Sequence, residues 1–357
     1  MKRLPLAALL AAFFIFLALS VSIRQAVLML VGVGMGAALA AARFGFTTGW
    51  RQLIEQRNPQ GVSGQVLLLA LASLAALPLL GQFPELHAAI GPPSVSLLVG
   101  AFVFGLTMQI ADGCGSGSLY KAGLGVPLNM GILPLFALGS FLGSVHLDSW
   151  LSLGQTAPVS FSAEYGTGGA LALTLALLAA VLVAVRLWVG AGQSWFDKRW
   201  VWGGVALAVL ATLNVLLAGQ PWGVVYGFGL WAAKISVALG AFDPAGNAFW
   251  GQAGNAQRLT QTVFMDVTTI TNIGILGGAL WVSAKAASNS TPLTTQQWVI
   301  GLVAGFVMGY SSRLAFGCNI GAMLSGISTG SLHGWLWVPL AFAGTLIGVR
   351  VRRHYQF

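Results

Sequence analysis

Residues 97–125, LLVGAFVFGLTMQIADGCGSGSLYKAGLG, contain the most informative pattern of the chain. They begin as an apolar run, which stops at the Gly-Cys-Gly turn of residues 113–115. Residues 301–327, GLVAGFVMGYSSRLAFGCNIGAMLSGI, align with this stretch without a gap at an offset of 204 residues. The alignment pairs the only two cysteines of the chain, Cys114 and Cys318. The chain therefore contains an internal repeat that carries a thiol at the same place in each copy.

The composition is that of a membrane protein. Hydrophobic residues make up 57% of the chain and charged residues only 7%, whereas soluble domains carry about 25% charged residues. Several apolar runs reach the ~20 residues that a helix needs to cross a bilayer, and the short alternating segments of a membrane β-barrel are not seen. We therefore predict an all-α integral membrane protein with about nine transmembrane helices and several short or broken, re-entrant helices.

The charges and cysteines exclude other classes of protein. The net charge of +9 does not indicate a nucleic-acid partner, because Lys and Arg lie at the ends of apolar segments, where they set topology and contact membrane lipid. The cysteines have no CxxC spacing and no neighbouring histidine, so no metal site is predicted, although a disulfide between them stays possible. No nucleotide-binding loop is present, and no cofactor or enzymatic activity is predicted.

The polar stretch AGQSWFDKR (191–199) separates two predicted membrane halves, residues 1–190 and 191–357, within a single membrane domain. Each half contains one copy of the Gly-Cys motif, at residues 113–117 and 317–321. The run that ends at Ile23 has the form of a signal peptide or of a retained first helix, and its length favours the retained helix.

Three further segments give specific expectations. Residues 43–59 predict a break followed by a short amphipathic helix at the surface. Residues 261–282 predict a span with Asp266 inside it, after a polar loop at 243–258. Residues 285–297 predict a polar linker.

The repeated turns suit a small anion. Non-helical backbone at membrane depth is tolerated only where protein or a water-filled cavity surrounds it. A helix that begins there directs free N–H groups and a partial positive charge inward, and transporters built from repeats often bind substrate at such an interface. A thiol adds an S–H donor and a polarisable acceptor, which suit sulfur. The sequence predicts two turns facing each other in mid-membrane around a small sulfur-containing anion, with the substrate path contacting Gly113, Cys114, Gly115, Gly117, Gly317, Cys318, Asn319 and Gly321.

Charged residues supply further candidates, each with a structural alternative. Lys121 and Arg43 are predicted to face the substrate path, although either side chain can instead reach an interface. Lys234 lies within an apolar stretch and is a stronger candidate, because charges inside a membrane are costly. Asp112 and Asp266 are possible proton-handling acids, or structural partners of Arg313 or Lys234. A buried cysteine can likewise be only a small apolar residue.

Three motifs resemble the YeeE/YedE family of bacterial inner-membrane proteins, which includes thiosulfate transporters. They are GLTMQIADGCGSGSLYKAG (105–123), RLAFGCNIG (313–321) and RFGFTTGWR (43–51). The resemblance implies an hourglass-like helical fold in the bacterial cytoplasmic membrane, with broken helices meeting centrally. It also implies that thiosulfate passes along the axis by successive hydrogen bonds to cysteine thiols.

The chain departs from the family pattern at three positions. Gly45 stands where the family has a cysteine in its first motif, so one thiol of the implied path is missing. Asp112 stands where the family tends to have glycine, and Lys121 takes the place of an arginine. The resemblance therefore implies either another sulfur or selenium species as substrate, or thiosulfate handled with two thiols.

Two functions follow as expectations. The first is uptake of thiosulfate or a related small sulfur anion past the two thiols. The alternative is a membrane-embedded sulfurtransferase or sensor that passes sulfur to a small cytoplasmic sulfur-carrier protein, which needs a nucleophilic thiolate.

Overall fold

The computed structural model describes residues 3–283 and 292–357, so most of the predicted linker 285–297 lies outside the described residues. Within these ranges the chain is helical and contains no named strand. Nine of the described helices are long and apolar enough to cross a membrane, which confirms the all-α membrane fold. In chain order the elements are α1 (Arg3–Ser20), α2 (Ile23–Ala42), α3 (Phe46–Gln56), α4 (Gln60–Gln82), α5 (Val95–Ile110), α6 (Gly115–Gly123), α7 (Pro127–Val145), α8 (Leu147–Leu151), α9 (Phe161–Val189), α10 (Lys198–Ala218), α11 (Val225–Ala238), α12 (Ala253–Thr260), η1 (Val263–Met265), α13 (Val267–Ser283), α14 (Thr295–Leu314), the π-helix η2 (Asn319–Leu324), α15 (Ser325–Ser328) and α16 (Leu332–His354).

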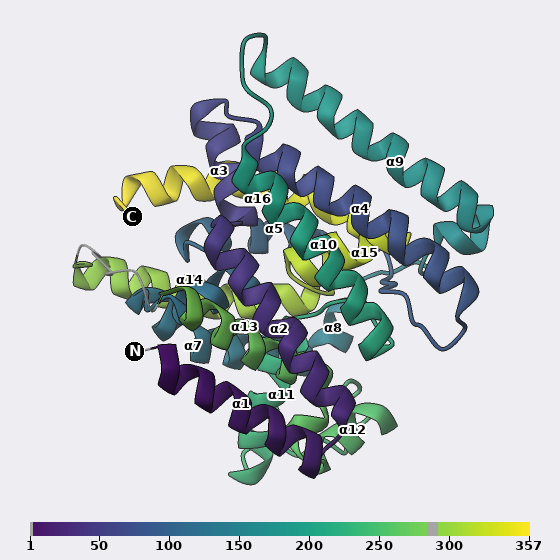
Figure 1. Ribbon diagram of the computed structural model, residues 1–357, viewed down its shortest axis with the longest axis vertical. Helices are drawn as coiled ribbons and strands as arrows, with labels where there is room; N and C mark the ends of the chain where they lie inside the picture. Colours follow the sequence, from purple (N-terminus) through teal and green to yellow (C-terminus); the bar gives the residue numbers. More distant parts are fainter. Residues whose placement is uncertain (1–2, 284–291) are drawn as a thin grey trace.

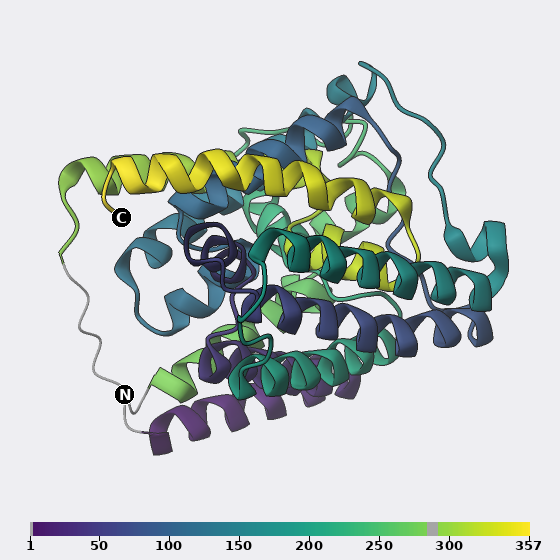
Figure 2. The same cartoon turned by 90° about the horizontal axis from the view of Figure 1, so that it is seen from above.

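The long helices run side by side between two opposite faces of the molecule. Figures 1 and 2 both place the two chain ends at the same edge, and we call this side the terminal face. Helices α2, α9, α13 and α16 end there, whereas α4, α7, α10 and α14 end at the opposite side, which we call the far face.

The internal repeat extends into the packing of the helices. An ideal Cβ atom on Gly344 of α16 would overlap the carbonyl oxygen of Phe102 on α5. Its counterpart Gly139 of α7 would meet the carbonyl oxygen of Phe306 on α14 in the same way. Each copy of the repeat thus packs its glycine-bearing helix against the other copy, with backbones so close that no side chain fits between them. The division into halves at residue 190 stays a prediction.

The two Gly-Cys turns return to the centre of the bundle. Ser96 Oγ, at the start of α5, donates to the Leu314 carbonyl oxygen at the end of α14 over 2.8 Å, so these helices run antiparallel. Since α5 has 16 residues, its own end lies ~24 Å from that contact. Nevertheless Cys318 Sγ lies 3.3 Å from the Cβ position of Gly115. The segments that follow α5 and α14 therefore fold back from opposite faces, and the two turns meet between these faces.

Three local expectations differ from the structure. Helix α3 is not confined to the surface, because it buries Phe46 and Trp50 against the core. Asp266 lies outside the span in which it was expected, since α13 begins only at Val267. The polar loop 243–258 is partly helical and includes most of α12. The alternatives for α1 stay open, although its Leu17 is fully buried against α2.

Candidate functional site

The first turn is shaped by its glycine and its backbone hydrogen bonds. Asp112 adopts a left-handed conformation with a φ of 52°, and Gly113 N–H donates to the Met108 carbonyl oxygen over 3.0 Å. A Cβ atom on Gly113 would lie 2.8 Å from Ser118 N, so the turn can close only over glycine. Cys114 then caps the N-terminus of α6, and its carbonyl oxygen accepts from Ser118 N–H at 2.8 Å.

The second turn repeats this arrangement bond by bond. Phe316 has a φ of 58°, and Gly317 N–H donates to the Ser312 carbonyl oxygen over 2.8 Å. Cys318 caps the N-terminus of η2, and its carbonyl oxygen accepts from Ala322 N–H, again at 2.8 Å. A repeat seen first as sequence is therefore also a repeat of backbone geometry.

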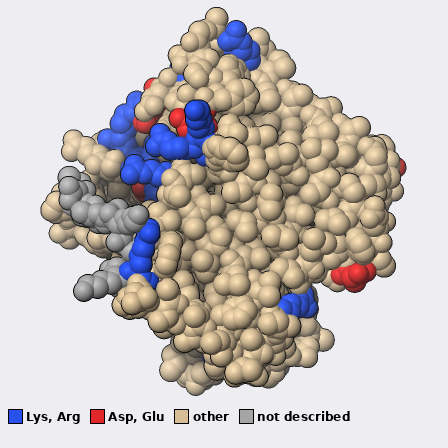
Figure 3. Space-filling model, in the orientation of Figure 1, with Lys and Arg blue, Asp and Glu red and all other residues tan. Residues whose placement is uncertain are grey.

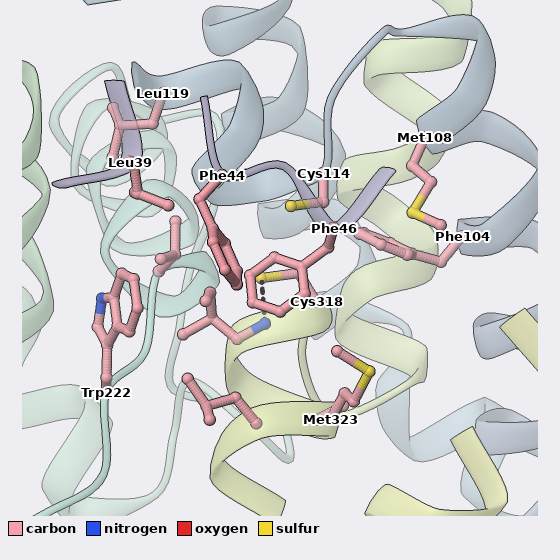
Figure 4. Close-up of a cluster of buried hydrophobic side chains, with 14 of the residues drawn as sticks. Leu39, Phe44, Phe46, Phe104, Met108, Cys114, Leu119, Trp222, Cys318 and Met323 are labelled. Carbon is pink, nitrogen blue, oxygen red and sulfur yellow. Dashed lines mark hydrogen bonds between the residues drawn. The ribbon is translucent and has the colours of Figure 1, made fainter. Parts of the chain in front are cut away.

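The two thiols lie in one buried cluster. Cys114 is 1% exposed and Cys318 is fully buried, and neither forms a disulfide. Cys114 Sγ lies 3.4 Å from Ser116 Oγ, and Ile320 N–H donates to Cys318 Sγ over 3.4 Å. Figure 4 shows both cysteines among apolar side chains that include Phe44. The structure thus brings the predicted turns together, whereas the role of the thiols stays a prediction.

Asn319 is the most unusual polar residue at the turns. It follows Cys318 directly, is fully buried, and corresponds to Gly115 in the first copy. Neither its side-chain oxygen nor its side-chain nitrogen has a hydrogen-bond partner among the described residues. An amide buried without partners costs about 1 to 3 kcal/mol, so its presence beside a thiol favours a polar ligand or water at this position.

A cavity opens beside α6 on the terminal face. It has a volume of about 550 Å³ and lies between the ends of α2, α6 and α13. We call it the terminal cavity. Its polar lining consists of Arg43, Thr48, Tyr120, Lys121 and Ser283.

A second cavity lies at the repeat-related place on the far face. Tyr120 and Lys121 line the terminal cavity, and the residues 204 positions later are Leu324 and Ser325. Leu324 and Ser325 line the second cavity, together with Trp222. Its volume is only about 10 Å³, roughly enough for one water molecule. The cavity on the terminal face is thus much larger than its repeat-related counterpart on the far face.

Gly45, where the family pattern has a cysteine, lies next to Thr48 and Tyr120, which line the terminal cavity. It caps the N-terminus of α3, and a Cβ atom there would lie 3.0 Å from Thr48 Oγ1. The same atom would lie 3.6 Å from the Tyr120 hydroxyl. The position that lacks a thiol thus has two hydroxyl groups beside it.

Asp112 is the counter-ion of three cations. Its carboxylate lies 2.9 Å from Arg51 Nη1, 2.6 Å from Lys121 Nζ and 3.2 Å from Arg352 Nη1. Lys121 also donates to the Asp112 backbone carbonyl oxygen. These partners come from α3, α6 and α16, so the cluster ties three distant segments together. Proton handling by Asp112 stays a prediction, but the alternative that it pairs with Arg313 or Lys234 is wrong.

Two other candidates are not brought to the cysteines. Lys234 Nζ donates to the carbonyl oxygens of Leu259 at 2.7 Å and Gln261 at 2.5 Å, which closes the C-terminal end of α12. The expected pairing of Asp266 with Arg313 or Lys234 is also wrong, because its carboxylate accepts from Arg258 Nη1 at 2.8 Å.

Asp266 also caps the start of α13, where it accepts from Thr269 N–H at 2.7 Å. Burial raises the pKa of its carboxyl, and the hydrogen bond from Thr269 and the charge of Arg258 oppose that effect. The contacts of both residues, Lys234 and Asp266, belong to the packing of α11 to α13, so their roles on a substrate path stay predictions.

Sequence reasoning missed Thr48, Tyr120 and Ser325 as candidates. Thr48 and Tyr120 lie inside the quoted motifs at 43–51 and 105–123, but their residue types gave no chemical signal. Ser325 could have been found as the repeat counterpart of Lys121.

Comparison with known proteins gives consistent matches. The sequence model of the sulphur transport family matches residues 41–347. The chain is 24% identical to the thiosulfate transporter TsuA of Escherichia coli over 347 residues, which cover 87% of this chain and 91% of that protein. It is 30% identical to the thiosulfate transporter TsuA of Spirochaeta thermophila over 265 residues, which cover 68% and 73%. A probable transporter YedE of Salmonella typhimurium is 28% identical over 170 residues, 46% of this chain and 40% of the relative.

Proposed function

Because this chain belongs to the sulphur transport family, we propose that it carries thiosulfate or a related small sulfur anion into the cell past the thiols of Cys114 and Cys318. The observation that carries the proposal is the meeting of two thiol-bearing turns beside the unpartnered amide of Asn319. The relatives that match over most of their length are named thiosulfate transporters, which supports this substrate class.

The chemistry of the turns fits the two ends of thiosulfate. Its terminal sulfur is polarisable and accepts a hydrogen bond from a thiol, which suits Cys114 and Cys318. Its negative charge is stabilised by free N–H groups at the start of α6, where the helix dipole adds a charge of roughly +0.5. The turns would then form the narrow middle of the path, and the terminal cavity would receive the anion on one side.

The distribution of charge indicates the orientation of the chain in the membrane. Cations of the described segments gather on the terminal face, and Figure 3 shows Lys and Arg concentrated on the side of the chain ends. They include Arg3, Arg43, Arg51, Arg57, Lys121, Arg186, Lys198, Arg199, Arg350, Arg352 and Arg353. Excess Lys and Arg mark the cytoplasmic side of inner-membrane proteins. We assign the terminal face to the cytoplasm and the far face to the outside, with substrate entering at the far face.

The two halves would then be copies of opposite orientation. Helices α5 to α7 and α14 to α16 enter the membrane from opposite faces and exchange their packing partners. Such inverted repeats typically enclose the substrate at their interface and alternate its exposure between the two sides. On this proposal, the large terminal cavity and the small far cavity would correspond to one state of that cycle.

The experiment is uptake of radiolabelled thiosulfate into proteoliposomes that contain the purified chain. We expect uptake well above that of empty vesicles, and little uptake of labelled sulfate, which has no terminal sulfur for the thiols. Thiosulfate uptake equal to that of empty vesicles would refute the proposal. A persulfide on Cys114 after exposure to thiosulfate, detected by mass spectrometry, would instead favour the sulfurtransferase alternative and its small sulfur-carrier partner.

A further inference from the structure

We propose that the terminal cavity is an oxyanion-binding site in which Arg43, Thr48 and Tyr120 hold the oxygen end of the substrate. Sulfate would therefore bind there, although we expect little uptake of it. The inference rests on the proposed function and adds a site that recognises oxygen to the thiols that recognise sulfur. Its ligand class is a small tetrahedral dianion with several terminal oxygen atoms.

The positive charge that lines the cavity is not balanced by a carboxylate among the lining residues that the structure describes. Two of these residues, Arg43 and Lys121, are cations, and none is an acid. Lys121 is paired with Asp112, which lines the neighbouring cavity together with Arg352. Arg43 belongs to none of the ion pairs found among the described residues. The terminal cavity therefore carries a net positive charge that an anion can neutralise.

The hydroxyl groups complete the coordination. The Tyr120 ring is buried, with 3% of the residue exposed, yet the residue lines the cavity. The Cβ position of Gly45 lies 3.0 Å from Thr48 Oγ1 and 3.6 Å from the Tyr120 hydroxyl, so the two oxygens converge on one point. A guanidinium with two converging hydroxyls offers several hydrogen-bond donors to oxygen, and Arg in particular matches the geometry of oxyanions.

Because Gly45 has no side chain, the space beside the Thr48 and Tyr120 hydroxyl groups is free. A larger side chain there would place its Cβ atom 3.0 Å from Thr48 Oγ1 and would crowd both hydroxyl groups. The volume of about 550 Å³ holds a tetrahedral anion together with part of its hydration shell. The site thus suits an anion that leaves the thiols and is rehydrated before release.

The test is equilibrium binding of radiolabelled sulfate to the purified full-length protein in detergent, in about 0.15 M NaCl to screen surface charge. Arg43→Asn removes the guanidinium without new strain, because Arg43 is exposed with a φ of 48° and asparagine tolerates that region. We expect the affinity for sulfate to fall at least about tenfold, as a lost charge-assisted contact implies.

Arg57→Asn is the matched control. Arg57 also has a positive φ, 53°, at the end of a helix on the terminal face, but it does not line the cavity. Its replacement should change the affinity for sulfate less than about twofold, since Arg57 cannot contact an anion in the cavity and the salt screens its more distant charge. Tyr120→Phe and Thr48→Val, which keep the shape of the side chain, should each weaken binding about three- to tenfold.

The outcomes separate this inference from the proposed function. Equal weakening by Arg43→Asn and Arg57→Asn would show general charge attraction and overturn the inference, as would wild-type protein that binds no sulfate. If sulfate binding depends on Arg43 but thiosulfate uptake is absent from the same preparation, the oxyanion site stands and the transport proposal fails. If thiosulfate uptake is present but the Arg43, Thr48 and Tyr120 variants bind sulfate as the wild type does, the transport proposal stands and the oxyanion site is refuted.

Discussion

Alanine at Cys318 is expected to lower thiosulfate uptake by about 10- to 150-fold, which is the loss of one hydrogen bond to a charged ligand, about 1.5 to 3 kcal/mol. Cys114→Ala should have an effect of similar size, because the two thiols occupy equivalent turns. Initial rates of radiolabelled uptake into proteoliposomes measure both variants.

Serine supplies the matched control for the thiol. Cys318→Ser keeps a hydrogen-bond donor but loses the polarisable sulfur, so its uptake should lie between that of the wild type and that of the alanine variant. Because Cys318 is fully buried, the Tm of each variant is measured in parallel to separate misfolding from a loss of substrate contact. Wild-type uptake in the Cys114→Ala, Cys318→Ala double variant would contradict the role of the thiols.

Replacing Asp112 by asparagine is expected to destabilise the fold by about 2 to 3 kcal/mol. Removing one partner of a fully buried ion pair costs about 3 to 5 kcal/mol, and the smaller value allows for the partial exposure of this cluster. The carboxylate is 26% exposed and holds three cations that are 16% to 18% exposed. Without it, Arg51, Lys121 and Arg352 repel one another across α3, α6 and α16. The Tm of the purified protein in detergent should fall by about 5 °C or more.

The control for Asp112 is an acid of the same type in an exposed pair. Asp197 lies 3.6 Å from Arg199, whose side chain is 69% exposed, and such surface pairs contribute about 0 to 1 kcal/mol. Asp197→Asn should therefore leave the Tm almost unchanged. If both variants melt at the same temperature, Asp112 does not tie the three helices together. Added salt should narrow the difference between them, because it screens the repulsion.

The repeated turns could be predicted from the sequence because their geometry tolerates few residue types. A Cβ atom on Gly113 or Gly317 would lie within 2.8 Å of a backbone nitrogen, so glycine recurs at both places and makes the repeat visible. The extension of the repeat to α7 and α16 was less visible. Gly139 and Gly344 are related by an offset of 205 rather than 204. The offset thus grows by one residue between the Gly-Cys turn and α16. This interval contains the π-helix η2, whose wider turn takes up one extra residue.

The contacts of the charged residues could not be predicted, because they depend on which segments meet in three dimensions. Arg51 and Asp112 are 61 residues apart, and Arg352 reaches the same carboxylate from the end of the chain. Lys234 looked like a path residue because it lies in an apolar stretch, yet its partners are the carbonyl oxygens at the end of α12. A costly charge within an apolar helix indicates a partner, but the sequence does not tell whether that partner is substrate or backbone.

The central claim is that both thiols face one path that thiosulfate occupies. The most direct measurement is the rate at which a small anionic methanethiosulfonate reagent labels Cys114 and Cys318 in proteoliposomes, with thiosulfate or with chloride at equal ionic strength. The chain has no other cysteine, and the single variants Cys114→Ala and Cys318→Ala assign each rate. If the proposed function is right, both cysteines react and thiosulfate slows both reactions. Labelling rates that are the same with and without thiosulfate would contradict it.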